Sequence, residues 1–385
     1  MTDRAADLTA DLAYGAPERA ADTASGVWNE AWDDGGVDTG HDLGTSHLAP
    51  GASGVALTGP ANVVALTPLA SRPEPYAFAA GFGDGTVALY RGPARDGAGA
   101  DVQVRPGARH EAAVSGVITL SGAVVSAGQD GTVRGADGVI TAPGSWCEHL
   151  TASPAGETFA VAAGRAVVLG TLSGATVRLA DHPSSVSGLA FAPDGRQLAA
   201  SHYNGVTIWS VGRGTKVRTL AWKGSHIGVT WSPDGRFVVS ATQERELHVW
   251  DLAADKDFRL GGYAAKVRSL AWLGAPAHLL ASGADAITAW PFGDVGPGVL
   301  PPKEIGFGHK ALVTRVAAHP SRPQVAGGYS NGTVLVGGVK KGEASFVRLA
   351  DGAPVTALAY TANGTLIAAT RSGRIEAIRF DKEVQ

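Results

Sequence analysis

The side chains of this sequence best suited to bind a transition metal are Cys147, His149 and His226. When the prolines that follow them are aligned, Cys147 and His226 fall at the start of equivalent strands, where we expect both to face one mouth of a central channel. A thiolate with two imidazoles is a ligand set that zinc accepts. Strong zinc motifs, however, have ligands close together in sequence. We therefore expect no metal and no cofactor, with these three residues as weak candidates only.

The sequence motifs give little support for an enzymatic function. The chain has no phosphate-binding loop ending in Gly-Lys-Ser/Thr and no His-Glu-x-x-His. Its Asp-Gly-Thr sequences recur regularly, so their glycines are assigned to turn geometry. A quinoprotein dehydrogenase propeller would need a vicinal cysteine pair, and this chain has one cysteine. We predict a non-enzymatic protein.

An internal repeat organises the chain. A turn followed by a short alternating strand recurs about every forty residues, a period typical of propellers. A weaker copy lies at Gly164–Leu169. The seven clearer copies are Gly83–Tyr90, Gln129–Val133, Asn204–Trp209, Glu246–Asp251, Asp285–Trp290, Asn331–Val336 and Ser372–Ile378.

A second element precedes each copy. It alternates apolar with small or polar residues and ends in a turn, as in Val186–Gly195, Ile227–Gly235 and Val355–Gly364. This alternation predicts an antiparallel strand, and the Pro-Asp-Gly and Asn-Gly pairs predict tight turns. A third strand fits between the two elements. The pattern predicts an all-β protein of four-stranded units.

Four strands per repeat, with a turn aspartate before a strand that ends in tryptophan, resemble the WD-repeat (WD40-type) β-propellers. The dipeptide itself occurs once, as Trp250-Asp251. In that family a histidine before the inner strand bonds through a serine or threonine to the turn aspartate. The resemblance implies that the following residues pin the blades: His110, Ser126, Asp130, His182, Ser201, Asn204, Trp209, His309 and Asn331.

We count eight blades in a single propeller, with seven as the alternative because the third repeat is weak. The last repeat ends on its third strand, so a strand near Ser53–Thr58 is expected to close the ring. The predicted domains are an acidic extension at residues 1–48 and the propeller at residues 49–385.

Four stretches between His202 and Ser269 further resemble alphaproteobacterial WD-repeat proteins found near zinc metallochaperone genes. This resemblance implies an intracellular role linked to metal homeostasis and names no activity.

Composition limits the cellular compartment and the kinds of partner that we expect for this protein. The 53 glycines and 17% charged residues suit short strands joined by turns. No apolar stretch reaches the roughly 20 residues of a membrane helix, and the segment after Met1 is polar and acidic. No cluster of Lys and Arg favours nucleic acid. We expect a cytoplasmic protein that binds neither membrane nor nucleic acid.

The turns of repeats four to six carry aromatic and adaptable polar residues, a mixture suited to a protein or peptide partner. The alternative is that the aromatic residues only pack between blades. We name this surface the repeat-four-to-six face: His202, Tyr203, Asn204, Trp222, Lys223, His226, Gln243, Glu244, Arg245, Tyr263 and Lys266.

The acidic extension contains Trp28 and Trp32, which a helix would place on one face. Such a segment can dock into an apolar groove of its own propeller or of a partner. Its Gly, Ala and Asp content equally fits a disordered, solubilising tail. The sequence leaves both readings open.

Overall fold

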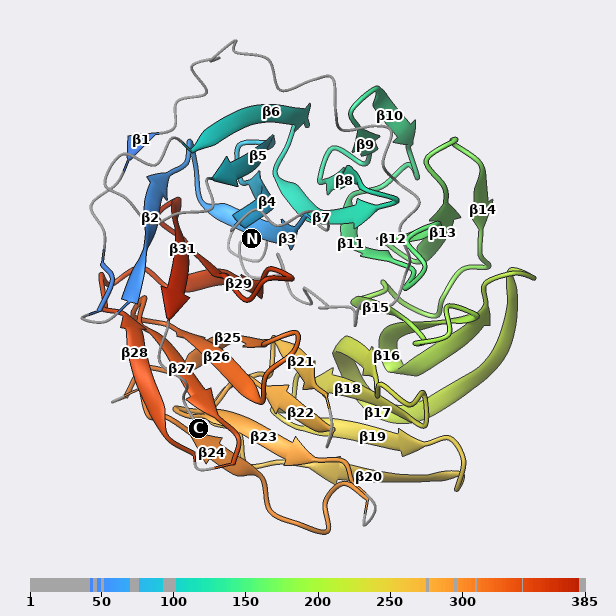
Figure 1. The fold of residues 1–385 in the computed structure, drawn as a ribbon. Coiled ribbons are helices and arrows are strands. Elements are labelled where there is room, and N and C mark those ends of the chain that lie inside the picture. Colours follow the sequence, from blue (N-terminus) through green and yellow to red (C-terminus); the bar gives the residue numbers. More distant parts are fainter. Residues whose placement is uncertain are drawn as a thin grey trace, which may run out of the picture.

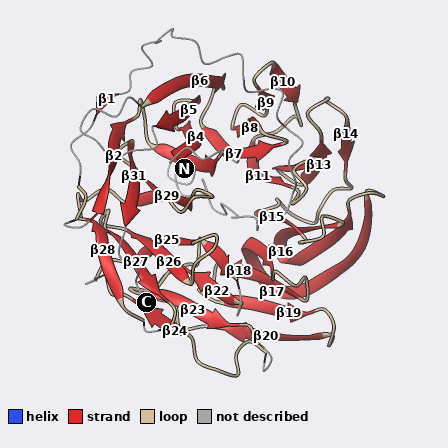
Figure 2. Ribbon diagram, in the orientation of Figure 1, coloured by secondary structure: helices blue, strands red, loops and turns tan. Residues whose placement is uncertain are grey.

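The computed structural model describes residues 42–43, 47–49, 52–69, 76–92, 102–274, 277–293, 296–308, 310–340 and 342–380. These residues form β-strands and turns, and none of them lies in a helix that could span a membrane. The strands assemble into antiparallel sheets arranged as a ring (Figures 1 and 2). The predicted all-β propeller is confirmed.

The sheets follow one another along the chain. Repeat one is β3 (Val63–Pro68), β4 (Tyr76–Phe82), β5 (Thr86–Gly92) and β6 (Gln103–Arg109). Repeat two is β7 (Val114–Leu120), β8 (Ala123–Gly128), β9 (Val133–Gly135) and β10 (Gly138–Thr141). Repeat three is β11 (Cys147–Ala152), β12 (Phe159–Ala163), β13 (Ala166–Gly170) and β14 (Thr176–Arg178).

Repeat four holds β15 (Gly188–Phe191), β16 (Gln197–Ser210) and the first part of β17 (Thr215–Trp231). Repeat five holds the last part of β17 with β18 (Phe237–Thr242), β19 (Leu247–Asp251) and β20 (Lys256–Leu260). Repeat six is β21 (Leu270–Leu273), β22 (His278–Ala281), β23 (Ile287–Pro291) and β24 (Lys303–Ile305). Repeat seven is β25 (Val313–Ala318), β26 (Gln324–Tyr329), β27 (Val334–Gly338) and β28 (Ala344–Arg348). The last sheet is β1 (Asp42–Leu43), β2 (Ala52–Thr58), β31 (Arg374–Phe380), β30 (Leu366–Thr370) and β29 (Val355–Tyr360).

The described strands form seven hydrogen-bonded sheets, so the favoured count of eight separate blades is wrong and the alternative of seven is supported. The physical reason lies in repeats four and five, which share one six-stranded sheet. β16 and β17 are longer than the sequence predicts, because they continue through positions where turns were expected. The pair Tyr203 and Ser225 extends the ladder between them beyond the β-bulge at Asn204. The weak third repeat, by contrast, forms a regular sheet of its own.

The two ends of the described chain meet in the last sheet, where β2 pairs antiparallel with β31 from Ala52–Phe380 to Thr58–Arg374. Upstream of β2, Leu48 makes an antiparallel bridge to Arg348 at the end of β28. Between β1 and β2 the chain therefore contacts repeat seven.

The core lies between neighbouring sheets. On β4, Phe78 and Ala80 pack towards Ile367 and Ile375 of the last sheet, while Ala79 packs towards Val114 of repeat two. Because each middle strand is covered on both faces, its residues are buried without interruption, as in Phe237–Thr242. Stability is thus distributed over contacts between adjacent repeats.

Candidate functional site: the face of repeats four to six

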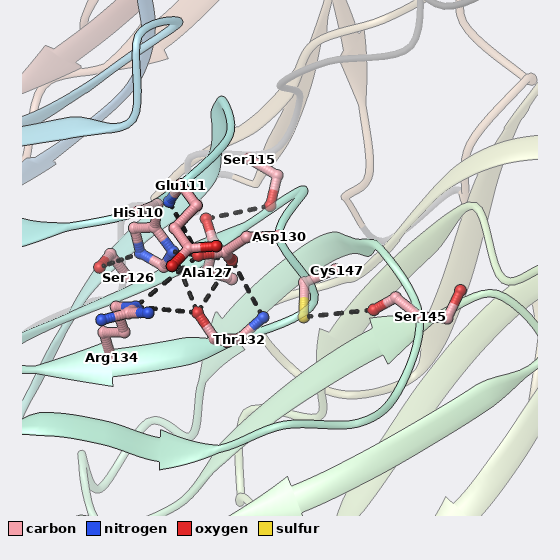
Figure 3. Close-up of polar contacts among 10 residues, drawn as sticks. All are labelled: His110, Glu111, Ser115, Ser126, Ala127, Asp130, Thr132, Arg134, Ser145 and Cys147. Carbon is pink, nitrogen blue, oxygen red and sulfur yellow. Dashed lines mark hydrogen bonds and ion pairs between the residues drawn. The ribbon is translucent and has the colours of Figure 1, made fainter.

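The turn between repeats one and two shows how a histidine pins a blade (Figure 3). His110 is buried; its Nδ1 donates to Asp130 over 3.0 Å and its Nε2 accepts from the Ser126 hydroxyl over 2.8 Å. Asp130 also accepts from the hydroxyl of Thr132 over 2.8 Å and from the amides of Glu111 and Thr132. The close packing leaves no room for a side chain at Gly85, because a Cβ there would lie 2.3 Å from the His110 carbonyl oxygen.

The pKa of Asp130 reflects this network. Burial raises the pKa, but hydrogen bonds from His110, from Thr132 and from the two amides outweigh burial and lower it to about 2. A carboxylate whose pKa is depressed on folding stabilises the native state above its unfolded pKa, about 4. That stabilisation is lost as the pH falls towards 2.

Asp130→Asn is therefore expected to lower the free energy of unfolding by about 1–3 kcal/mol at pH 7. The difference from the wild type should shrink between about pH 4 and pH 2. Urea unfolding at several pH values measures both effects. Asp194→Asn, at an exposed turn, is the control and should change stability by less than about 0.5 kcal/mol. An equal difference at pH 3 and pH 7 would contradict the assigned role of the Asp130 carboxylate.

Four of the residues predicted to pin blades form the expected set of repeat four, and their geometry differs from that around His110: His182, Ser201, Asn204 and Trp209. His182 donates from Nδ1 to the Arg165 carbonyl over 3.0 Å and accepts at Nε2 from the indole of Trp209 over 2.9 Å. Ser201 instead contacts the Gly188 carbonyl, and Asn204 lies on the surface, where it accepts from the Gly224 amide over 3.2 Å. The prediction that all four residues form one network is wrong, because β16 continues past the expected turn.

In repeat seven, Asn331 accepts from the Thr333 amide over 3.1 Å. Its predicted partner His309 lies outside the described residues, as do Trp28 and Trp32.

Tyr263 was predicted to lie on the repeat-four-to-six face but is only 8% exposed. Its hydroxyl accepts from the indole of Trp290 over 2.7 Å, as His182 does from Trp209. Burial raises the pKa of the Tyr263 phenol. The sequence held a signal for this role: Tyr263 precedes Val267 by four residues, the spacing of His182 from Val186.

Two histidines predicted on the same face are buried as well. His202 donates to the Tyr203 carbonyl over 2.8 Å and accepts from Thr207 over 2.9 Å. His226 donates to the Trp222 carbonyl over 3.0 Å and accepts from Ser240 over 2.7 Å. Burial lowers the pKa of both imidazoles. Because both nitrogens of each ring are engaged within the protein, neither histidine is a contact residue.

The predicted orientation of Cys147 and His226 towards a channel mouth is also wrong. Cys147 is buried in an apolar cluster with Val133 and Phe159, and burial raises the pKa of its thiol to about 12. His149 is half-buried, and burial lowers its pKa to about 4. Among the described residues, no three His, Cys, Asp or Glu side chains gather in a group that could hold a metal.

Trp222 is half-buried. Its ring stacks on His248 at a centroid distance of 4.0 Å, and the Arg259 guanidinium lies 5.9 Å from its centre. Burial lowers the pKa of His248 to about 4. Trp222 therefore supports the edge of the face more than it projects from it.

The remaining predicted residues are exposed and lie side by side. Tyr203 is 55% exposed, next to Asn204, which has a positive φ of 66°. Glu244 packs over Gly224, where a Cβ would lie 3.0 Å from its carboxylate. The exposed part of the face consists of Tyr203, Asn204, Lys223, Gln243, Glu244, Arg245 and Lys266.

Contacts between turns hold this exposed part together. Lys266 donates to the Gln243 side chain over 3.4 Å, and Arg245 donates to the Ala264 carbonyl over 3.2 Å. The backbone N–H of Gln243 donates to the Ser225 carbonyl over 3.0 Å. The face thus presents one aromatic ring among charged groups on strands that are continuous across repeats four and five.

Residues 328–332 match the Gly-x-Ser-x-Gly pattern of hydrolases, a match that motif reading missed. A nucleophile elbow joins a strand to a helix. Here the segment joins β26 to β27, and the Ser330 hydroxyl accepts from the Leu312 amide over 3.2 Å. The pattern therefore belongs to a hairpin turn.

Comparison with known proteins agrees with the fold. The family model "WD domain, G-beta repeat" matches residues 174–210 and 214–251, which run from β14 to β19. These residues carry WD repeats. The architecture as a whole fits a WD-repeat β-propeller.

Three known proteins illustrate the similarity. "WD repeat-containing protein AAC3" of Dictyostelium discoideum is 31% identical over 87 residues, 22% of this chain and 18% of that protein. "Chromatin assembly factor 1 subunit FAS2 homolog" of Oryza sativa subsp. japonica is 33% identical over 103 residues, 24% of this chain and 20% of that protein. The matches thus span a fifth or less of either relative's length. The crystal structure of the computationally designed Ika8 protein has a TM-score of 0.68 at 20% identity, covering 84% of this chain and 97% of that one, and shows the fold alone.

Proposed function

We propose that this protein is a non-enzymatic interaction scaffold in the cytoplasm, and that its partner protein binds the exposed part of the repeat-four-to-six face. The proposal rests on Tyr203, a largely exposed ring on the same face as the exposed side chains of Lys223, Glu244 and Arg245. Aromatic and arginine side chains supply most of the binding energy at protein interfaces, and charged neighbours set specificity.

Two further observations support the proposal. The face is built on long strands, so its turns are held by continuous backbone hydrogen bonds and lose little freedom on binding. WD-repeat relatives generally act as interaction scaffolds, and the rice relative is by its name a subunit of a chromatin assembly factor.

Affinity purification of the full chain from its own organism, followed by mass spectrometry, tests this proposal. Tyr203→Ala with Lys223→Glu is expected to reduce recovery of a stoichiometric partner by on the order of tenfold or more, because both residues are exposed on the face. Trp146→Ala is the matched control, since Trp146 is 58% exposed in the turn before β11 and is not one of the residues of the face. Full recovery with the double variant would contradict the proposal.

The metal-homeostasis alternative stays a prediction from sequence resemblance. Elemental analysis of the same purified sample decides it: stoichiometric zinc without a partner protein would favour the alternative. A stoichiometric partner without zinc would favour the scaffold.

A further inference from the structure

A groove of about 530 Å³ lies between repeats three and four, outside the repeat-four-to-six face. Its lining includes Arg165, Asp181, His182, Trp209, Lys216 and Thr219. The volume falls in the range of ligand sites in proteins, about 300–1,000 Å³.

The groove lies beside the end of β14, the three-residue outer strand of repeat three. After β14, Leu179 is buried in the core, and residues 180–183 form one wall. The other wall is the sheet of repeat four, where Trp209 pairs with Lys216 and Thr207 pairs with Thr219.

The floor of the groove is fixed by hydrogen bonds. Trp209 is 4% exposed and donates its indole N–H to His182, whose other nitrogen donates to the Arg165 carbonyl. The Thr207 hydroxyl donates to His202. Since these polar atoms are engaged within the protein, the buried floor offers a ligand few hydrogen-bonding groups.

The two walls carry positive charge. Arg165 and Lys216 are both exposed, and Arg165 donates from Nε to the His182 carbonyl over 2.7 Å. The acidic group of the groove, Asp181, is paired with Arg178 at 2.8 Å. Within the described residues, Lys216 has no ion-pair partner. In repeat five the residue paired with the equivalent Trp250 is Asp257, so repeat five has the opposite charge at this position.

We propose that this groove binds an extended acidic peptide segment of a partner protein. A carboxylate of the peptide lies between Arg165 and Lys216, where charge-assisted hydrogen bonds hold it. A neighbouring side chain of the peptide lies along the walls of the groove. The inference rests on the proposed scaffold role and assigns it a second, chemically defined contact site.

Randomised hexapeptide pools with one position fixed as Glu, Gln or Lys test the proposal on the full chain. At one or more positions the Glu pool should be retained on the order of tenfold more than the Gln pool. Arg165→Glu with Lys216→Glu should reverse the preference towards the Lys pool. Lys256→Glu, an exposed lysine on β20, is the control and should leave the preference unchanged.

Lys216→Gln, a milder change at an exposed site, should abolish most of the acidic preference if the double variant fails to fold. Equal retention of Glu and Gln pools, or an acidic preference that survives charge reversal, would overturn the proposal. Binding that appears only after Trp28→Ala with Trp32→Ala would assign the groove to the protein's own acidic extension and overturn the partner assignment. Tyr203→Ala should leave the pool preference unchanged, so failure of the groove and failure of the face are distinguishable.

Discussion

Arg348→Met is expected to lower the free energy of unfolding by about 3–5 kcal/mol, because it leaves a buried carboxylate without its partner. Arg348 and Glu376 are both fully buried, with Nε 3.1 Å from Oε2, and Arg348 also reaches Asp351 at 2.7 Å. Glu376 in turn accepts from the His47 amide over 3.2 Å. These contacts join β28, β31 and the segment at Leu48, so the loss is expected to loosen the contact between repeat seven and the last sheet. Urea unfolding measures the change in the free energy of unfolding.

Two further variants make this test specific. Arg178→Met removes an arginine at the end of β14 that pairs with Asp181 at the same sequence separation, but on the surface, so its effect should stay below about 1 kcal/mol. Arg348→Met with Glu376→Leu should be less destabilising than Arg348→Met alone, since no buried charge is left unpaired. Equal losses for Arg348→Met and Arg178→Met would refute the role of burial.

Trp231→Ala is expected to lower the free energy of unfolding by about 3–5 kcal/mol, because it removes the largest side chain buried between repeats four and five and leaves a cavity. Trp231 is 2% exposed and packs in one cluster with Val206 and Trp250. Its indole donates to the Ala190 carbonyl over 3.1 Å, and the substitution also removes this hydrogen bond.

Thermal or urea unfolding measures the loss, with Trp146→Ala as the exposed tryptophan control, expected within about 0.5 kcal/mol of the wild type. A Trp231→Ala protein as stable as the control would show that the shared sheet, and not this cluster, holds the two repeats together.

Much of the fold could be predicted from the repeats. The alternating runs and Pro-Asp-Gly turns predict antiparallel strands, and the structure has them, as in β18 after Gly235. The sheet count could not be predicted, because the spacing of repeats four and five resembles that of their neighbours. Whether the ladder between β16 and β17 extends past Asn204 to Tyr203 and Ser225 depends on backbone pairing.

The site was harder to predict, because residue type does not fix exposure. Tyr203 and Tyr263 both look like contact residues, yet only Tyr203 projects from the surface, since Tyr263 replaces a blade-pinning histidine. The groove cations Arg165 and Lys216 come from different repeats, 51 positions apart in the sequence, so no local motif brings them together.

Hydrogen exchange on the full chain, free and bound to the partner recovered from its organism, tests the central claim most directly. The scaffold account predicts slower exchange in the complex at residues 202–204, 223–225, 243–246 and 264–266, with repeats one and two unchanged. Protection confined to other repeats, or none at all in a stoichiometric complex, would contradict it.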